Sequence, residues 1–308
     1  MTTQSTGAHE ESLLGSGPYP RHRGRLVAVA VAAGFLLTVV WSASFVDQVI
    51  GENVADTLLG HDARTTPITG ALAGIVFAFV SGLAGTLTAC NVAVFGAMGP
   101  LLGGNSRPRM REALAPLKWI IAGMVGVSAV YGAVVALVGT RMPQFSTART
   151  TGGLSARNIQ SMIAFGVVGV VFILLGLIAL GLLRNPVRHR PQMPLLVVGA
   201  SIGGFLIGRP YPLFRVMFHD AAESHNVLYG MAAFVLQSLG NVLVVVLLSA
   251  LLVRFAGARL RRWFAAKPER AASVTGVCLL VAGTFTLLYW DIRVLSRVGL
   301  IWYPMIGW

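Results

Sequence analysis

Long apolar stretches separated by short charged segments dominate the pattern of this chain. An α-helix needs about 20 consecutive apolar residues to cross the hydrocarbon core of a bilayer, and seven stretches reach that length. They do not alternate with period two, as the strands of a membrane barrel would. The pattern therefore predicts an all-α membrane protein with seven transmembrane helices. The predicted helices cover residues 26–46, 67–88, 118–139, 159–183, 193–217, 228–254 and 271–292.

The apolar pattern around residues 67–103 is too long for one straight helix and too short for two helices with a loop. It contains several residues that weaken or end helices, namely Gly82, Gly85, Gly96, Gly99 and Pro100. We predict one helix that breaks around Thr86–Asn91 and continues at a tilt. A long tilted helix with a frayed end is the alternative.

Composition and charge add the orientation. The chain has 308 residues, of which 55% are hydrophobic and 11% charged, against about 25% charged residues in soluble domains. With the N-terminus inside, sixteen Lys and Arg residues fall in inner segments and six in outer ones. The positive-inside rule therefore predicts a protein of the plasma or inner membrane with a cytoplasmic N-terminus and an external C-terminus. The net charge of +13 follows from this topology, so the lipid bilayer is the expected partner and nucleic acid is not.

The two ends of the chain are expected to lie outside the helical core. Residues 1–25 are predicted to be a disordered cytoplasmic tail, and 26–46 an N-terminal transmembrane helix. A cleaved signal peptide ending near Ser42–Ser44 is the alternative to that helix. Residues 293–308 form an external tail whose Trp302, Tyr303 and Trp308 fit an interfacial aromatic anchor or a docking surface.

The six remaining spans divide into two sets of three. Leu83–Met98 can be aligned with Ile202–Met217 at an offset of 119 residues, and each segment belongs to the first span of its set. Because three is odd, the second set, 193–292, must be inverted relative to the first, 67–183. The predicted fold is thus one extra N-terminal helix plus a 3+3 inverted repeat with interrupted first helices. Such repeats place binding sites near the midplane, at the interruptions.

Polar residues concentrate at these interruptions. Pro210 and Pro212 each remove a backbone donor and disturb a helix. Arg209 and Arg215 either face a cavity and contact an anion, substrate or partner, or extend to the outer interface. The candidate midplane residues are Thr88, Asn91, Arg209, Pro210 and Arg215.

The segment G-L-A-G-T-L-T-A-C-N at 82–91, opening a three-helix repeat rich in small residues, resembles the transmembrane thiol–disulfide carriers of the cytochrome c biogenesis and DsbD type. Their wider superfamily also contains amino-acid and metal exporters. The resemblance covers residues 67–292. It implies an inverted 3+3 core with one redox cysteine in the first helix of each repeat, moving reducing equivalents outward. Cys90 matches the first position, and a thioredoxin-like protein is an implied partner.

The chain departs from that family pattern at both cysteine positions. The prolines that flank the first cysteine are replaced by Ala89 and Asn91, and Arg209 stands where the second cysteine is expected. The only other cysteine is Cys278, in the last span. A disulfide requires Cα atoms within about 7 Å, and the alternative for either residue is a small buried hydrophobic side chain.

Two further polar groups are candidates for binding. His219, Asp220, Glu223 and His225 follow the fifth span and carry carboxylate and imidazole groups suited to a divalent metal; an ordinary solvated loop is the alternative. Gln237, Ser238 and Asn241 lie in the middle of 228–254, where they either bond between helices or line a polar path.

Three functions remain open from the sequence. The resemblance favours a thiol–disulfide or electron carrier; a small ion or solute transporter on the same fold is the second hypothesis, and a subunit of a respiratory or assembly complex is the third. Proton coupling is disfavoured, because Asp291 is expected at the end of its span. The chain has no phosphate-binding glycine loop, haem-attachment C-x-x-C-H or metalloprotease H-E-x-x-H, so no cofactor is predicted.

Overall fold

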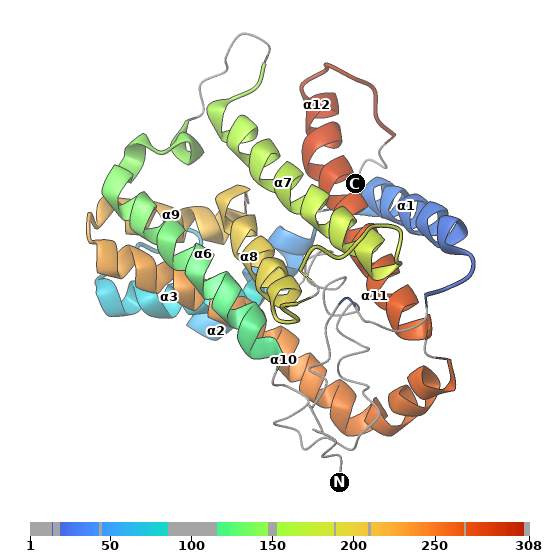
Figure 1. Cartoon of the computed structure of the whole chain (residues 1–308). Helices are drawn as coiled ribbons and strands as arrows, with labels where there is room; N and C mark the ends of the chain where they lie inside the picture. The colour runs from blue at the N-terminus through green and yellow to red at the C-terminus, as the bar shows by residue number, and fades with distance from the viewer. Residues whose placement is uncertain are drawn as a thin grey trace.

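A computed structural model describes most of the chain (Figure 1). The described residues are 14, 19–42, 45–85, 116–146, 153–187, 189–208, 211–267 and 269–304. The predictions about residues 1–13, the break at 86–91 and Trp308 lie outside them. So do those about Thr88, Cys90, Asn91, Arg209 and Pro210.

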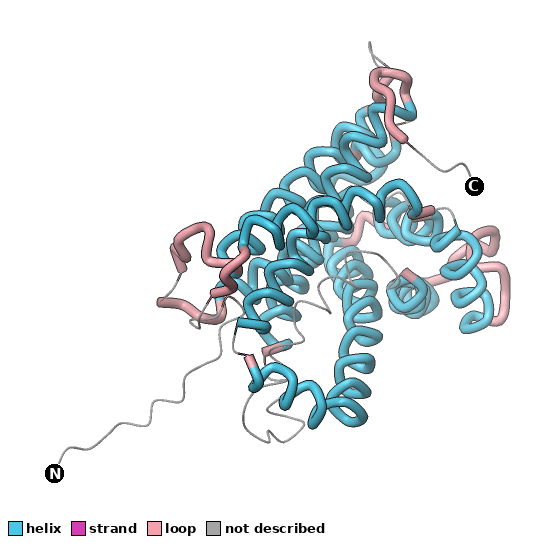
Figure 2. Tube along the Cα trace, turned by 90° about the vertical axis from the view of Figure 1, so that its right-hand side faces the viewer, coloured by secondary structure: helices cyan, strands magenta, loops and turns pink. Residues whose placement is uncertain are grey.

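The described part of the chain consists of helices joined by loops, with no strands, as the sequence predicts (Figure 2). Five helices are long and apolar enough to cross a membrane, or six if one bent pair counts as a single span. The apolar helices indicate a multi-pass membrane protein in contact with the lipid bilayer. The helices are α1 (Arg23–Val40), η1 (Phe45–Glu52), α2 (Asn53–Leu59), α3 (Ala71–Ala84), α6 (Leu117–Val138), η2 (Gly139–Arg141), η3 (Pro143–Phe145), α7 (Ala156–Ala179), α8 (Met193–Gly208), α9 (Pro212–Glu223), α10 (Val227–Ala266), α11 (Glu269–Leu287), η4 (Leu288–Ile292) and α12 (Arg293–Arg297).

Two helix ends differ from those predicted. Helix α10 runs for 40 residues and carries the basic segment after Arg254 as helix instead of loop. Helix α11 continues through the π-helical turn η4 and α12, so the apolar span extends to Arg297. Six helical residues therefore follow Asp291, which the sequence places at the end of its span.

Glycines set the closest helix contacts. Gly82 of α3 packs on the backbone carbonyl of Gln237 in α10, and a Cβ built there would lie 2.8 Å from that carbonyl carbon. Gly199 of α8 packs in the same way on Ile120 of α6, with a corresponding distance of 2.7 Å. Real Cβ atoms essentially never show contacts under 3.0 Å. The two backbones can therefore approach this closely only where no side chain intervenes, as is common in membrane helix pairs.

Helices α7 and α11 also meet through glycines. Gly169 faces Gly283, and Gly176 faces Gly276; a Cβ on any of the four would lie within 2.6 to 3.1 Å of the opposite helix. Because the residue numbers rise in one helix as they fall in the other, the pair is antiparallel. Figure 1 shows α7 and α11 crossing the same region of the molecule.

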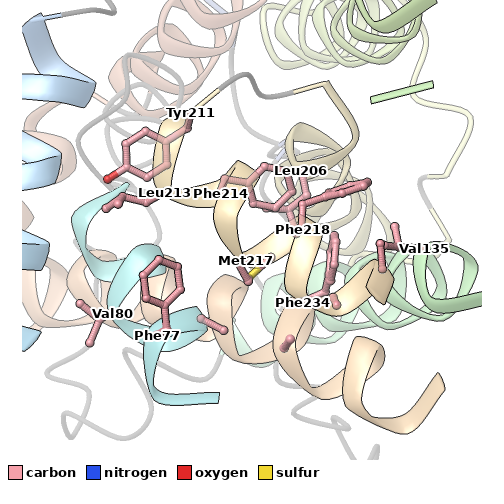
Figure 3. Close-up of a cluster of buried hydrophobic side chains, with 14 of the residues drawn as sticks. Phe77, Val80, Val135, Leu206, Tyr211, Leu213, Phe214, Met217, Phe218 and Phe234 are labelled. Carbon is pink, nitrogen blue, oxygen red and sulfur yellow. The ribbon is translucent and has the colours of Figure 1, made fainter. Parts of the chain in front are cut away.

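Helix α9 occupies the largest core cluster. Its Leu213, Phe214, Met217 and Phe218 are fully or almost fully buried, between α3, α6 and α10 (Figure 3). Phe218 and Phe214 both make edge-on contacts with Phe234 of α10. The short helix is thus held inside the bundle by aromatic packing.

Helix α1 belongs to the same bundle as α11. Gly34 packs on Val281 and Thr284 of α11. At the end of α1, the buried Arg293 donates hydrogen bonds from Nη1 to the carbonyls of Thr38 (2.8 Å) and Trp41 (2.9 Å). These carbonyls lack a partner within their own helix, so Arg293 acts as the C-terminal cap of α1.

Candidate functional site

The break between α8 and α9 is the centre of the candidate site. Helix α8 ends at Gly208, α9 begins at Pro212, and the two axes bend by 84°. Proline at the first position of α9 fits because that position needs no N–H donor. The prediction that this helix is interrupted here agrees with the bend, although Arg209 and Pro210 themselves lie outside the described residues.

Side chains from two neighbouring segments satisfy the carbonyls that the break releases. Gln144 of η3 and Gln160 of α7 both donate from Nε2 to the Ile207 carbonyl, at 2.8 and 2.9 Å. Ser161 Oγ donates to the Gly208 carbonyl at 2.6 Å. Freed backbone carbonyls at membrane depth need partners, and these three side chains, here called the carbonyl clamp, supply them. Tyr131 also belongs to this group, because its hydroxyl accepts a hydrogen bond from Gln160 Nε2 at 2.9 Å.

A polar cavity of about 770 Å³ lies beside the start of α9. Its walls come from three parts of the chain: the loop before α3, the η3 turn, and α9. The lining residues that carry charge or an amide are Arg64, Gln144, Arg215, His219, Asp220 and Glu223. Gln144 is shared by the cavity and the carbonyl clamp, so the cavity directly adjoins the broken helix.

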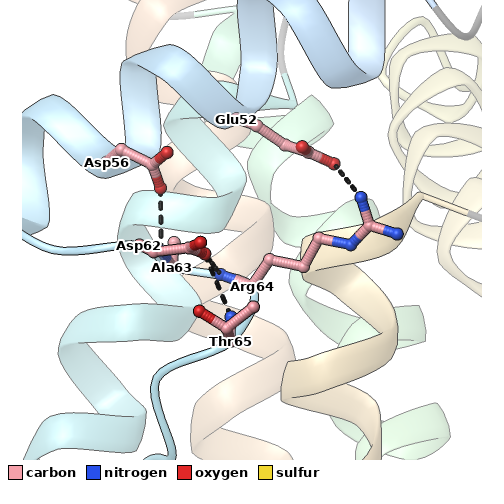
Figure 4. Close-up of polar contacts among 6 residues, drawn as sticks. All are labelled: Glu52, Asp56, Asp62, Ala63, Arg64 and Thr65. Carbon is pink, nitrogen blue, oxygen red and sulfur yellow. Dashed lines mark hydrogen bonds and ion pairs between the residues drawn. The ribbon is translucent and has the colours of Figure 1, made fainter.

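The cavity carries charges of both signs. Arg64 pairs with Glu52 at 3.7 Å (Figure 4), and His219 Nδ1 lies 3.3 Å from Glu223 Oε2. Arg215 of α9 also lies on the cavity wall and adds a positive charge there. The cavity can therefore receive a solute with a negative group at the Arg215 side.

The loop that brings Arg64 to the cavity is shaped by two carboxylates (Figure 4). Asp56 accepts from the Ala63 N–H at 2.8 Å, and Asp62 accepts from the N–H groups of Arg64 (2.8 Å) and Thr65 (3.0 Å). These backbone donors hold the pKa of Asp62 below its usual range. Burial raises the pKa of Glu52 above its usual range, although Arg64 opposes this.

A second, smaller cavity of about 380 Å³ lies around the other face of α9. Here the Tyr229 hydroxyl of α10 donates to the Asp220 carboxylate. Both groups lie against Gly74 of α3, where a Cβ would be 2.9 Å from Asp220 Oδ2. This hydrogen bond joins the end of α9 to α10, under the first turns of α3.

The four residues suggested as metal ligands do not converge. Asp220 is bonded to Tyr229, His219 pairs with Glu223, and the His225 ring lies against Gly139. In the part of the chain that the structure describes, no three His, Cys, Asp or Glu side chains gather closely enough to hold a metal ion. The metal-site hypothesis therefore gains no support, and these residues serve the cavity wall and the end of α9 instead.

The mid-span polar residues of α10 divide between two roles. Ser238 shares a hydrogen bond with Ser128 of α6 at 2.6 Å, so it bonds between helices. Asn241 is buried beside Gly82. Gln237 is fully buried, yet neither polar atom of its carboxamide has a hydrogen-bond partner among the described residues. A buried amide without partners costs free energy, so Gln237 suits a path that holds water or a solute.

Cys278 is half-buried in α11 and packs against the apolar cluster that includes Val168, Phe172 and Leu279. Apolar surroundings of this kind favour the thiol over a reactive thiolate. Cys90 lies outside the described residues, so the structure does not bring the two cysteines together or keep them apart.

Sequence reasoning did not single out the carbonyl clamp or Tyr131. Gln144, Gln160 and Ser161 lie at the start of a span or in the turn before it, where polar residues are ordinary. The signal that they share is the presence of amide and hydroxyl side chains opposite a predicted helix break. This signal becomes useful only once α7 and α8 are known to be neighbours.

No protein-family model matches this chain, and neither a curated protein nor a solved structure matches it.

Proposed function

We propose that this protein is a membrane carrier for a small polar solute, built on an inverted repeat, with the polar cavity as the mouth of its path. The observation that carries the proposal is the broken α8–α9 pair. Its released carbonyls are held by the carbonyl clamp, and it opens onto a cavity lined by charges of both signs. Broken helices of this kind line the substrate sites of many transporters.

The glycine contacts support the inverted repeat. Gly82 and Gly199 are 117 positions apart, and so are the carbonyls that they meet, Gln237 and Ile120. The reciprocal contacts keep the same spacing: Gly240 packs on Phe79, and Gly123 on Leu196. The α3–α10 and α6–α8 interfaces therefore use equivalent residues, which is expected if two repeats are related by a twofold axis.

The α7–α11 pair supports the same symmetry with a spacing of 107. Gly169 and Gly276 are 107 positions apart, and so are Gly176 and Gly283. The contact between Gly169 and Gly283 is therefore equivalent to the contact between Gly276 and Gly176. Their neighbours follow the exchange too. Leu287 meets Gly169 at 2.7 Å and Leu180 meets Gly276 at 2.6 Å, measured to the built Cβ. The third helices of the two repeats would thus pack on each other across the axis.

The glycine contacts repeat at a spacing of 117 residues, which we use in place of the offset of 119 residues from the sequence alignment of the two repeats. It pairs Gly208, the last residue of α8, with Asn91, so the proposed break in the first repeat falls at the end of the 86–91 segment. It also pairs Cys90 with Ile207, and a second family cysteine is missing in this register as well. The proposed orientation, with the N-terminus cytoplasmic and the C-terminus external, stays as the positive-inside rule gives it.

Gln237 supports a path near the midplane. It is ten residues into α10, or about 15 Å at 1.5 Å per residue, which is half of a hydrocarbon core of about 30 Å. Its unpartnered carboxamide lies where α3 contacts α10. A solute or water at this depth would satisfy it.

The test is uptake by the purified protein in proteoliposomes, using a panel of labelled amino acids, inorganic oxyanions and divalent cations. Arg215→Gln removes the cationic wall of the cavity, and we expect uptake of the transported solute to fall about 10- to 100-fold, as for the loss of one charged hydrogen bond. Arg141→Gln is the matched control, because Arg141 is exposed and does not line the cavity.

Equal uptake by the two variants would contradict the role of the cavity. No uptake of any panel member by the wild-type protein would contradict the carrier function. Uptake by the purified chain would also exclude the third hypothesis, a subunit without activity of its own.

The thiol–disulfide hypothesis remains as the function that the 82–91 resemblance implies. It is tested by maleimide labelling of Cys90 and Cys278 in membranes with and without reductant. Labelling that requires reductant at both cysteines would favour the redox function over the solute carrier. Labelling that is equal with and without reductant would exclude the thiol–disulfide hypothesis.

A further inference from the structure

Asp291 is a carboxylate inside an apolar span. Among the described residues of the five continuous candidate spans, the only other Asp or Glu is Glu269, at the first residue of α11. Asp291 stands on the π-helical turn η4, and such turns are frequently found at functional sites. An ionisable residue within a membrane span is costly and usually functional.

Asp291 and the α8–α9 break lie at about the same height along the axis of the helix bundle. Gly283 faces Gly169 across the α7–α11 interface. Asp291 lies eight residues beyond Gly283, and Ser161 lies eight residues before Gly169. In an antiparallel pair these two positions are at about the same height, and Ser161 is the residue that holds the Gly208 carbonyl at the end of α8.

The Asp291 carboxylate has room but no polar partner in the part of the chain that the structure describes. Its Oδ2 is buried and makes no hydrogen bond to a described residue. On the α7 side it faces Gly166, where a built Cβ would lie 3.5 Å from Oδ1, in ordinary contact. The glycine thus leaves a space beside the carboxylate that any larger residue would fill.

The charged groups of the elements packed around η4 are turned elsewhere. Arg293 caps α1, with its guanidinium over the Tyr289 ring at 4.7 Å. Arg297 is exposed at the end of α12, and among the described residues neither it nor Arg157, the charged residue of α7, forms an ion pair with Asp291. The charged residues of α1, Arg23 and Arg25, are in its first turn, at the opposite end from the cap, and α8 has none. No charged side chain of these described elements therefore neutralises the carboxylate in an ion pair.

A chain of aromatic contacts connects this turn to the break. The ring of Trp290, next to Asp291, stacks on Phe165 of α7 with centroids 4.5 Å apart and planes at 19°. Phe165 in turn presses on Gly208, where a Cβ would lie 2.7 Å from its ring. A movement of η4 must therefore displace Phe165, and with it the end of α8.

We propose that Asp291 is a proton-binding site that couples proton movement to the α8–α9 break through Trp290 and Phe165. The proposal that this coupling drives solute movement rests on the carrier function above. In each cycle one proton from water binds a carboxylate oxygen and gives a neutral carboxylic acid; the same O–H bond breaks when the proton is released. Neutralisation removes a buried charge and creates a donor, so the two forms favour different positions of the η4 turn.

Proton binding is tested without transport, by infrared spectroscopy of the purified protein in lipid across a pH series. We expect a protonated-carboxyl band that titrates in the wild-type protein and in the control Glu269→Gln, but is lost in Asp291→Asn. Asp291→Glu should restore a titrating band, which separates loss of the group from loss of the fold. A band unchanged in Asp291→Asn, or no titrating band in the wild-type protein, would overturn the proposal.

Coupling is tested in proteoliposomes with the solute that the panel identifies. We expect an imposed pH gradient to accelerate wild-type uptake at least tenfold, and Asp291→Asn to lose that acceleration while solute exchange without a gradient continues. Trp290→Leu should keep the infrared band and lose the acceleration. Wild-type uptake that ignores the gradient would overturn the coupling and leave the carrier function standing. No uptake at all would overturn the carrier function and the coupling, while the spectra would still decide proton binding.

Discussion

Replacing Gly82 by alanine tests the closest helix contact of the bundle. The new methyl group would lie 2.8 Å from the carbonyl carbon of Gln237 and closer still to its oxygen. Ordinary contact begins at 3.4 Å, so α3 must move away from α10 by at least about 0.6 Å. The obstacle is backbone, which cannot rotate aside as the end of a side chain can.

The magnitude follows from that displacement. A gap of 0.5–1 Å loses about a quarter to a half of each dispersion contact along an interface, and overpacking typically costs about 1–3 kcal/mol. In lipid, packing itself holds the helices together, since burial from water contributes little. We expect Gly82→Ala to lower the free energy of unfolding by about 2–3 kcal/mol, and Gly199→Ala, with its 2.7 Å contact to Ile120, to do the same.

The assay is unfolding in mixed micelles, followed by circular dichroism. Gly126→Ala is the matched control, because a Cβ there meets nothing within 4 Å and alanine is the better helix former. The double variant Gly82→Ala with Gly240→Ala should cost less than the sum of its parts, because both open the same interface. Gly82→Ala with Gly199→Ala should be additive. A Gly82→Ala protein as stable as Gly126→Ala would refute the reasoning.

Three other predictions concern the end of α1, the end of α8 and the loop before α3. Arg293→Ala should lower the free energy of unfolding by about 2–3 kcal/mol, since two α1 carbonyls lose a charged donor; limited proteolysis after Trp41 should accelerate, and an unchanged rate would contradict the cap. Gln160→Leu should cost about 1–2 kcal/mol, because the Ile207 carbonyl loses one of its two donors; Gln192→Leu, outside the clamp, is the control in the same thermal melt. The lowered pKa of Asp62 makes its carboxylate stabilising above the ordinary value of 3.8, an effect lost as pH falls through the lowered pKa. Asp62→Asn should remove the part of the pH dependence of loop proteolysis that comes from protonation of Asp62. A pH profile of proteolysis that is the same in this variant and in the wild-type protein would contradict the stabilising role of the carboxylate.

The candidate site was only partly accessible to sequence reasoning. The interruption at 208–212 was predictable, because two prolines and a glycine within five residues cannot continue a helix. Arg215 lines the cavity and is also exposed, so its position agrees with both alternatives that the sequence left open. The carbonyl clamp was not predictable, because its members are up to 63 residues from the carbonyls they hold and are unremarkable in their own segments.

The sequence alone determined the class of this protein and the approximate extent of most of its spans. Runs of apolar residues longer than a bilayer is thick have only one stable environment, and in that environment the backbone must form helices. The tertiary structure decided the features that depend on which segments are neighbours in the folded protein. Glycine spacings acquire meaning only when another helix backbone lies against them, as Gln237 does against Gly82. The helix that carries Asp291 continues through η4 to Arg297, and the absence of a polar partner for Asp291 among the described residues depends on which faces of α7 and α1 surround it.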